Sequence, residues 1–128
     1  MTIIKKNELG NVLYFQQDVS YVNAAQIKQE LLTVLETSSF ECLWLDMSQV
    51  RFIDSIGIGI IATVYSSAKQ QNRRLVLCKT NPQVNLVFEL TGLDQVLEFS
   101  DDIPTFTDAS LDALNDQGPS LTLSATAR

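Results

Sequence analysis

Two short runs of continuous apolar residues constrain the fold of this chain most strongly. One is Cys42–Asp46 (Cys-Leu-Trp-Leu-Asp), and the other is Leu75–Cys78 (Leu-Val-Leu-Cys). Runs this short suit strands better than helices, and a strand without apolar–polar alternation is typical of one buried on both faces, as in a parallel sheet. We therefore predict two central strands of such a sheet, in which Cys42 and Cys78 are reduced thiols that fill strand positions.

The segments around these runs alternate between strand and helix patterns. Thr2–Lys6 and Val12–Gln17 are rich in β-formers and are separated by turn residues, which predicts an opening hairpin, and Leu93–Phe99 holds a last short strand. Apolar residues at helical spacing predict four helices, within 24–35, 54–70, 82–91 and Thr105–Leu114. The chain is thus expected to be a single α/β domain with a mixed sheet and about four helices, in the order β-β-α-β-α-β-α-β-α.

The composition excludes several classes of function. No histidine is present in the 128 residues, so Ser-His-Asp and Cys-His catalysis, His-ligated zinc or iron and a histidine phosphorelay are ruled out. Acidic residues outnumber basic ones by 15 to 9, and this net charge of −6 disfavours binding to a nucleic-acid backbone. No apolar run approaches the ~20 residues of a membrane span and no signal-peptide pattern is present, so we expect a cytoplasmic protein with no membrane segment. We also expect no metal and no cofactor.

The stretch Asp54–Gly59 (Asp-Ser-Ile-Gly-Ile-Gly) concentrates the features that bear on chemistry. Asp54 is placed to cap a helix, so Ser55 would lie in the first turn, where backbone N–H groups lack partners and the helix dipole is positive. Gly57 and Gly59 remove side chains just after Ser55, which would let another backbone or a partner's active site approach closely. The simpler interpretation is that Asp54 and Ser55 only cap the helix and that the glycines only let it pack on the sheet.

Enzyme and nucleotide-site interpretations of this region lack their motifs. A nucleophile elbow requires GxSxG and a histidine base, and a phosphate loop requires GxxxxGK[ST] or GxGxxG. Asp46, at the end of its strand, could be a phosphoacceptor like that of two-component receivers with Lys79 as a basic partner, but Phe15–Asp18 offers one acid where receivers use an acidic pair to hold magnesium. The structural alternative is that Asp46 accepts hydrogen bonds from N–H groups of the connector that follows it. We expect that the chain is not an enzyme.

Several motifs in this order carry a resemblance to a known family. Leu45-Asp46-Met47-Ser48 is followed by Phe52–Gly59, then by Asn81-Pro82 before a helix and by Leu90–Leu93 (Leu-Thr-Gly-Leu) at its end. Together they resemble STAS domains, and the group they are most similar to is the stand-alone bacterial anti-sigma factor antagonists. The resemblance covers about Thr2 to Leu114 and implies a STAS domain at 1–114, while the Ser-, Thr-, Ala- and Gly-rich residues 115–128 are expected to be a disordered tail.

The resemblance implies a protein that switches partners. In that family the unphosphorylated antagonist binds a GHKL-type anti-sigma factor kinase and frees the sigma factor. The kinase phosphorylates the serine that follows the aspartate, here Ser55, and a PP2C-type phosphatase reverses the modification. The implied partner-binding residues are Asp18, Ser20, Asp54, Ser55, Ile56, Gly57, Ile58 and Gly59. A phosphate would add about 1.5–2 negative charges to the centre of a docking surface, and Asp54 beside it would strengthen the repulsion.

This chain departs from the family pattern at two places. Many relatives carry Ser or Thr after the phosphoacceptor, whereas this chain has Ile56, so Ser55 is the only hydroxyl in the motif. Many also carry Gly-Glu-Leu-Asp where this chain has Gln17–Ser20 (Gln-Asp-Val-Ser), which bears on the identity of the kinase. Ile56, Ile58 and Tyr65 either extend the partner surface or belong to the core, and the core is the simpler interpretation.

Two other functions remain open for a domain of this family. Tyr21–Ala25 (Tyr-Val-Asn-Ala-Ala) is similar to STAS domains at the cytoplasmic end of SulP anion transporters, so the chain could be the regulatory module of a transporter or of a sensory complex. The same helix start could instead bind a small ligand or a nucleotide.

Overall fold

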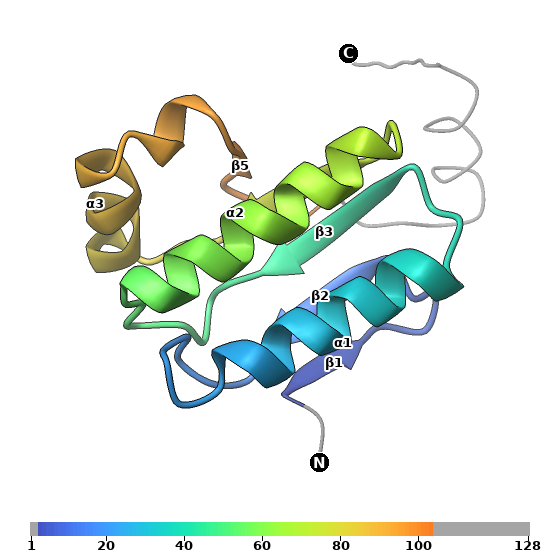
Figure 1. Cartoon of the computed structure of the whole chain (residues 1–128), viewed down its shortest axis with the longest axis horizontal. Coiled ribbons are helices and arrows are strands. Elements are labelled where there is room, and N and C mark those ends of the chain that lie inside the picture. The colour runs from blue at the N-terminus through green and yellow to red at the C-terminus, as the bar shows by residue number, and fades with distance from the viewer. Residues whose placement is uncertain (1–2, 104–128) are drawn as a thin grey trace.

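The computed structural model describes residues 3–103, which form three α-helices and a five-stranded sheet (Figure 1). The elements in chain order are β1 (Ile4–Lys6), β2 (Val12–Phe15), α1 (Ala24–Thr37), β3 (Cys42–Asp46), α2 (Ser55–Gln70), β4 (Arg74–Cys78), α3 (Pro82–Leu90), the 3-10 helix η1 (Leu93–Gln95) and β5 (Glu98–Ser100). The predicted α/β class is confirmed. The predicted fourth helix, Thr105–Leu114, and the tail 115–128 lie outside the described residues.

The strands follow one another across the sheet in the order in which they occur in the chain. β1 is antiparallel to β2, and β2, β3, β4 and β5 are parallel neighbours. The opening hairpin is therefore confirmed, and its turn depends on Asn7, whose side-chain oxygen accepts hydrogen bonds from the N–H groups of Gly10 (2.8 Å) and Val12 (3.1 Å). Gly10 has a φ of +80°, which a glycine adopts without strain.

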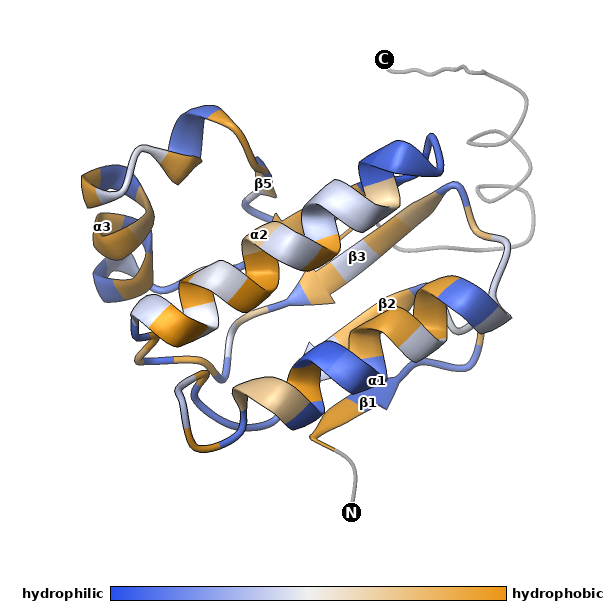
Figure 2. Ribbon diagram, in the orientation of Figure 1, coloured by the Kyte–Doolittle hydropathy of each residue, from blue (hydrophilic) through white to orange (hydrophobic). Residues whose placement is uncertain are grey.

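The central strands are buried on both faces, as their continuous apolar runs predict. Leu43 and Leu45 of β3 belong to the main core, whereas Trp44 between them packs with Val12, Val76 and Cys78 in a second cluster. Side chains of a strand alternate between the two faces of a sheet, so the two clusters lie on opposite sides. Figure 2 shows the resulting hydrophobic colouring along β3 and β2.

Helices α1 and α2 pack side by side across the main core (Figure 1). The helical spacing in α1 is confirmed, because its buried face is Ala24, Ile27, Leu31, Val34 and Leu35. Arg73, in the turn after α2, fixes the far end of this pair: its guanidinium donates to the carbonyl oxygens of Leu35 and Phe40 and to the hydroxyl of Ser38. This clamp joins the end of α1 to the turn between α2 and β4.

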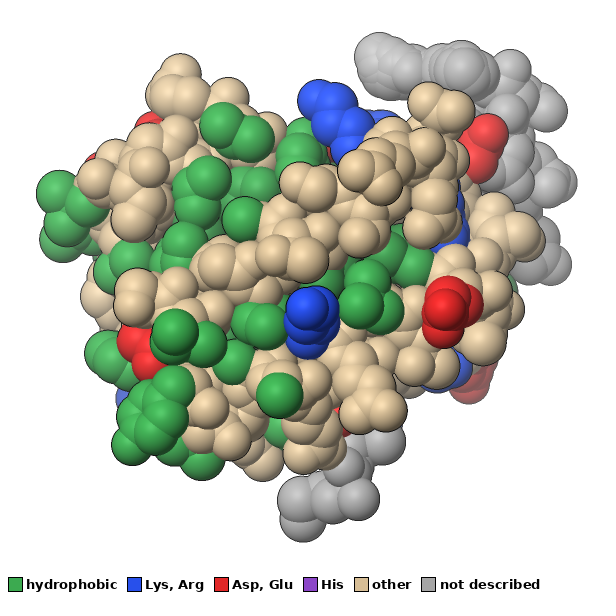
Figure 3. All heavy atoms as spheres, in the orientation of Figure 1, with side chains coloured by type: hydrophobic (Ala, Val, Ile, Leu, Met, Phe, Trp, Pro, Cys, Tyr) green, Lys and Arg blue, Asp and Glu red, His purple; other side chains and the backbone are tan. Residues whose placement is uncertain are grey.

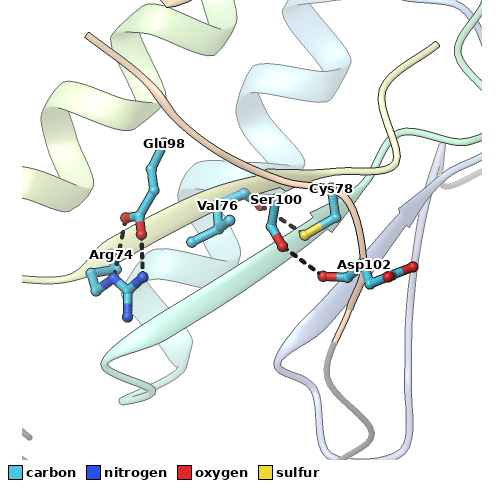
Figure 4. A network of polar contacts seen from close by, with 6 residues as sticks. All are labelled: Arg74, Val76, Cys78, Glu98, Ser100 and Asp102. Carbon is cyan, nitrogen blue, oxygen red and sulfur yellow. Dashed lines mark hydrogen bonds and ion pairs between the residues drawn. The ribbon is translucent and has the colours of Figure 1, made fainter. Parts of the chain in front are cut away.

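The β4–β5 edge is held by polar contacts on the sheet (Figure 4). Arg74 of β4 forms an ion pair with Glu98 of β5, and the Ser100 hydroxyl donates to the backbone carbonyl of Asp102. Both cysteines are free thiols, as predicted. Burial raises the pKa of each, Cys42 and Cys78, to about 12.

The last part of the described chain differs from the expectation in its detail. Gly92 ends α3 with a φ of +77°, in the left-handed conformation expected of a helix C-terminus. The residues Leu93–Gln95, however, form η1 rather than strand, and β5 begins only at Glu98. Within residues 3–103, no helix is long and apolar enough to cross a membrane, and no group of three or more Cys, Asp or Glu side chains could hold a metal ion.

Candidate functional site

The connector between β3 and α2, residues 47–54, is anchored to the sheet by Asp46. This side chain is 5% exposed, and one of its oxygens accepts hydrogen bonds from the Ser48 N–H (2.9 Å) and the Ser48 hydroxyl (2.6 Å). The structural alternative for Asp46 is thus confirmed. From the start of α3, the Asn81 amide donates to the carbonyl oxygens of Ser48 (3.2 Å) and Val50 (2.7 Å). Asn81 stands at the N-cap position of α3, but its side chain holds the connector instead of capping the helix.

Asp54 caps α2, as the sequence predicts. One carboxylate oxygen accepts from the N–H of Gly57 (2.8 Å), and the other accepts from the N–H of Tyr21 (2.9 Å), which belongs to the loop between β2 and α1. The bond from Gly57 is the main cause that lowers the pKa of Asp54, desolvation opposes it, and the bond from Tyr21 lowers the pKa further. Asp54 therefore has two tasks, because it begins α2 and also holds a distant loop beside that helix start.

The β2–α1 loop, residues 16–23, runs alongside the β3–α2 connector. Val19 and Ile53 form an isolated parallel bridge, in which the Val19 N–H donates to the Phe52 carbonyl (3.1 Å) and the Asp54 N–H donates to the Val19 carbonyl (3.2 Å). Asp18 adds a side-chain tie across the same pair of segments, because its carboxylate accepts hydrogen bonds from backbone N–H groups of the connector. These hydrogen bonds hold the two segments together, and Ser55 follows directly after the connector.

The two glycines after Ser55 have different environments. A Cβ on Gly57 would lie 2.7 Å from Cγ1 of Val19, 2.8 Å from the Val19 carbonyl oxygen and 2.9 Å from Cγ1 of Ile53. Gly57 therefore lets the chain's own β2–α1 loop approach the helix. A Cβ on Gly59 would meet no heavy atom within 4 Å, and Gly59 is exposed. Of the two, Gly59 is the one that leaves open space on the outer face of α2.

Ser55 is exposed in the first turn of α2, and the segments beside it, including the loop whose Tyr21 N–H binds Asp54, carry large exposed apolar side chains. We call these the Ser55 surface: Tyr21 (75% exposed), Val22 (77%), Phe52 (56%) and Ile56 (53%). Figure 3 shows hydrophobic side chains gathered at the end of the molecule where α2 begins, beside the β2–α1 loop and α3. An exposed cluster of this kind is typical of a protein-interaction site.

The sequence-predicted site residues divide into a surface group and a supporting group. The exposed members are Asp18, Ser55, Ile56 and Gly59, while Ser20 and Asp54 are half-buried. Gly57 and Ile58 are buried, so they support the Ser55 surface without forming it.

Tyr21, Val22 and Phe52 were not indicated as surface residues by sequence spacing. The feature that could have indicated them is that each is a large apolar residue in a segment without strand or helix periodicity. Tyr65, the remaining ambiguous residue, is half-buried and packs against the main core.

The fold and this site define the class of protein. The model of the STAS domain family matches residues 3–107, and the chain therefore belongs to the STAS domain family. The matched residues include all four motifs that carried this resemblance, from the end of β3 to the turn after α3.

Several relatives of the chain are named as anti-sigma factor antagonists. The chain is 26% identical over 96 residues to the anti-sigma-B factor antagonist of Listeria monocytogenes, which covers 74% of this chain and 83% of the relative. It has the fold of an anti-sigma factor antagonist from Mycobacterium paratuberculosis, with a TM-score of 0.61, 24% identity and coverage of 91% and 94% of the two chains. The Bacillus cell fate determinant SpoIIAA, solved in its phosphorylated form, has the same fold, with a TM-score of 0.58, 16% identity and coverage of 77% and 92%.

Proposed function

We propose that this protein is an anti-sigma factor antagonist that works by partner switching. In its unphosphorylated form it binds an anti-sigma factor that is a serine kinase of the GHKL type, and phosphorylation of Ser55 by that kinase releases it. The observation that carries the proposal is the position of Ser55, an exposed residue in the first turn of α2 whose neighbouring segments carry the exposed apolar side chains of the Ser55 surface. The relatives named as anti-sigma factor antagonists support the same partner class.

The hydrogen bonds at the start of α2 explain how a phosphate on Ser55 would act. The Gly57 N–H, in the first turn of α2, could have donated a hydrogen bond to a phosphate oxygen, but it already donates to the Asp54 carboxylate. A phosphate would add about 1.5–2 negative charges next to that carboxylate. The charge would therefore stay in water on the unbound protein, and no rearrangement of the fold is needed to accommodate it.

The switch then depends on what the partner must desolvate. Tyr21, Val22, Phe52 and Ile56 present apolar area that is favourable to bury, at about 25 cal/mol per Å². A phosphate among them would have to leave water without a counter-charge, which costs several kcal/mol. Binding of the unphosphorylated form is thus favoured and binding of the phosphorylated form is opposed at the same surface.

Phosphorylation by the cognate kinase tests the proposal. Incubation with the kinase, ATP and magnesium should add one phosphate at Ser55, detected by mass spectrometry of the intact protein and its peptides. Ser55→Ala should abolish the addition, and Ser66→Ala, which changes another exposed serine of α2, should leave it intact. Phosphate that still appears in the Ser55→Ala variant would show that the site assignment is wrong.

The affinity of the protein for a kinase that carries ADP, and therefore cannot phosphorylate it, gives a second test. Ser55→Asp should weaken binding to the ADP-loaded kinase at least about tenfold, since one carboxylate supplies part of the charge of a phosphate. Ser66→Asp is the matched control and should bind as the unchanged protein does. Equal affinity of the Ser55→Asp variant and the unchanged protein would contradict the electrostatic account.

The proposal also includes the reverse step and the location. A PP2C-type phosphatase would remove the phosphate from Ser55 and restore binding to the kinase. A sigma factor and an ATP-dependent kinase act inside the bacterial cell, so the proposal implies a cytoplasmic protein. Purified phosphorylated protein should regain kinase affinity after treatment with the cognate phosphatase, and failure to regain it would contradict this step.

A further inference from the structure

Asp18 is an exposed aspartate whose hydrogen bonds point inward, toward backbone. A single carboxylate oxygen accepts from the N–H of Arg51 (2.7 Å) and from the N–H of Phe52 (3.2 Å). These donors lie in the β3–α2 connector, 33 and 34 residues further along the chain. The Asp18 carboxylate therefore already has hydrogen-bond donors within the protein, before any partner binds.

The loop that carries Asp18 is itself held by Asn23. The Asn23 amide donates to the Asp18 carbonyl (2.7 Å) and to the side-chain oxygen of Gln17 (3.3 Å), and its own oxygen accepts from the Ser20 N–H (3.1 Å). Asn23 stands at the N-cap position of α1 without making a side-chain cap bond. The start of α1 therefore fixes the place from which Asp18 reaches the connector.

The connection is reciprocal. Asp18 of the β2–α1 loop holds backbone of the connector, and Asp54 of the connector holds the Tyr21 N–H of the β2–α1 loop. The first contact holds the backbone of Arg51 and Phe52, and the second comes from the residue just before Ser55. Two carboxylates thus fix both exposed segments of the Ser55 surface against each other.

We propose that Asp18 is a positioning residue for the phosphorylation of Ser55 and does not act as a charge that contacts the kinase. This inference rests on the proposed function. Asp18 holds Arg51 and Phe52 in the one conformation that places the Phe52 side chain and the start of α2 for docking. Without its carboxylate, the two N–H groups bond to water and the connector populates other conformations, so the apparent affinity falls by the fraction that remains competent.

Two substitutions separate positioning from charge. Asp18→Asn removes the charge but keeps a carbonyl oxygen that can accept from the same N–H groups. Asp18→Ala removes both the charge and the acceptor. If Asp18 acts by positioning, the asparagine variant stays close to the unchanged protein, whereas a direct charge contact makes both variants equally poor.

The experiment measures KM and kcat for Ser55 phosphorylation by the cognate kinase, together with amide hydrogen exchange by NMR. We expect Asp18→Ala to raise KM about tenfold with kcat unchanged, since hydrogen bonds to a charged group are worth about that factor or more. Asp18→Asn should stay within about threefold of the unchanged protein. Asp101→Ala, at an exposed aspartate after β5, is the matched charge control and should change neither constant. Exchange should speed up at Arg51 and Phe52 in the alanine variant alone.

Several results would overturn the inference. Equal rises in KM for Asp18→Ala and Asp18→Asn would assign a charge contact, and an unchanged KM for Asp18→Ala would assign only a structural role. If the alanine variant does not fold, Asn23→Ala replaces it, because it loosens the same loop and leaves the Asp18 charge in place. A raised KM supports positioning there, and an unchanged KM refutes it.

The two proposals fail in different ways. If the kinase does not phosphorylate Ser55 of the unchanged protein, the proposed function fails, and amide exchange still reports whether Asp18 holds the connector. If Ser55 is phosphorylated normally and KM is insensitive to Asp18→Ala, only the positioning inference fails.

Discussion

Alanine at Gly57 and alanine at Gly59 should change stability in opposite directions. A Cβ at Gly57 would lie 2.8 Å from the Val19 carbonyl oxygen, and that carbonyl accepts the N–H of Asp54. The oxygen belongs to backbone and cannot rotate away as a side chain can. Accommodating the methyl group therefore requires the β2–α1 loop to move away from the start of α2.

The structure sets the size of each effect. Overpacking a close contact costs about 1–3 kcal/mol, and the gain in helix propensity from glycine to alanine, at most about 1 kcal/mol, offsets part of it. Gly57→Ala should thus lower the free energy of unfolding by about 1–2 kcal/mol. At Gly59 the added methyl group meets nothing within 4 Å, so the propensity gain remains and the free energy of unfolding should rise by about 0.5–1 kcal/mol.

Urea unfolding measures both variants against the unchanged protein. Trp44 is the chain's single tryptophan and is 7% exposed, so its fluorescence reports the loss of the core. With a urea slope of about 1–2 kcal/mol per molar, the midpoints of the two variants should differ by roughly 1–3 M. A Gly57→Ala variant as stable as Gly59→Ala would refute the close-contact argument. A stabilised Gly59→Ala variant that also binds the kinase poorly would place Gly59 within the docking surface.

Further expectations concern acid, thiols and the sheet edge. Hydrogen bonds lower the pKa of Asp54 in the folded state, so the stabilisation by its carboxylate is present above the unfolded pKa of 3.8 and is lost as the pH falls through the folded pKa. The urea midpoints of the unchanged protein and of Asp54→Asn should therefore converge from pH 6 to pH 2.5. A constant difference between the two midpoints would contradict this. With pKa values of about 12, Cys42 and Cys78 should react with a disulfide reagent at pH 8 far more slowly in the folded protein than in urea, and a fast folded-state reaction would contradict the burial. Arg74→Ala should cost at most about 1 kcal/mol in urea unfolding, because its ion pair with Glu98 is 58% and 38% exposed, and a loss above about 2 kcal/mol would show a larger role.

The sheet could be predicted from sequence because its signal is local. The residues Leu43–Asp46 of β3 and Leu75–Cys78 of β4 are all buried, and continuous apolar runs of this kind indicate a strand covered on both faces without reference to the rest of the chain. The Asp54 cap was predictable for the same reason, since its acceptor and the donor Gly57 lie three residues apart. The same locality applies to Gly92, where a left-handed residue ends α3.

The site was predictable only in part because its contacts are non-local. Sequence spacing indicates Ser55 and its neighbours, but nothing near Asp18 shows that its carboxylate binds backbone more than 30 residues away. Gly57 was expected to let either another backbone or a partner approach, and the segment that approaches it is the backbone and side chain of Val19 of the same chain. Asn81 likewise has the pattern of a cap, yet tertiary structure offers its amide two carbonyl oxygens of the connector.

Tyr21 and Asp54, which meet at 2.9 Å, are separated by 33 positions in the chain. Residues up to Ile56 must therefore have left the ribosome before the serine and its apolar neighbours can come together. A peptide cut from around Ser55 carries the hydroxyl but not Tyr21. A kinase that requires both segments would respond to the number of completed, folded molecules in the cell, and newly made or damaged chains would not compete for it.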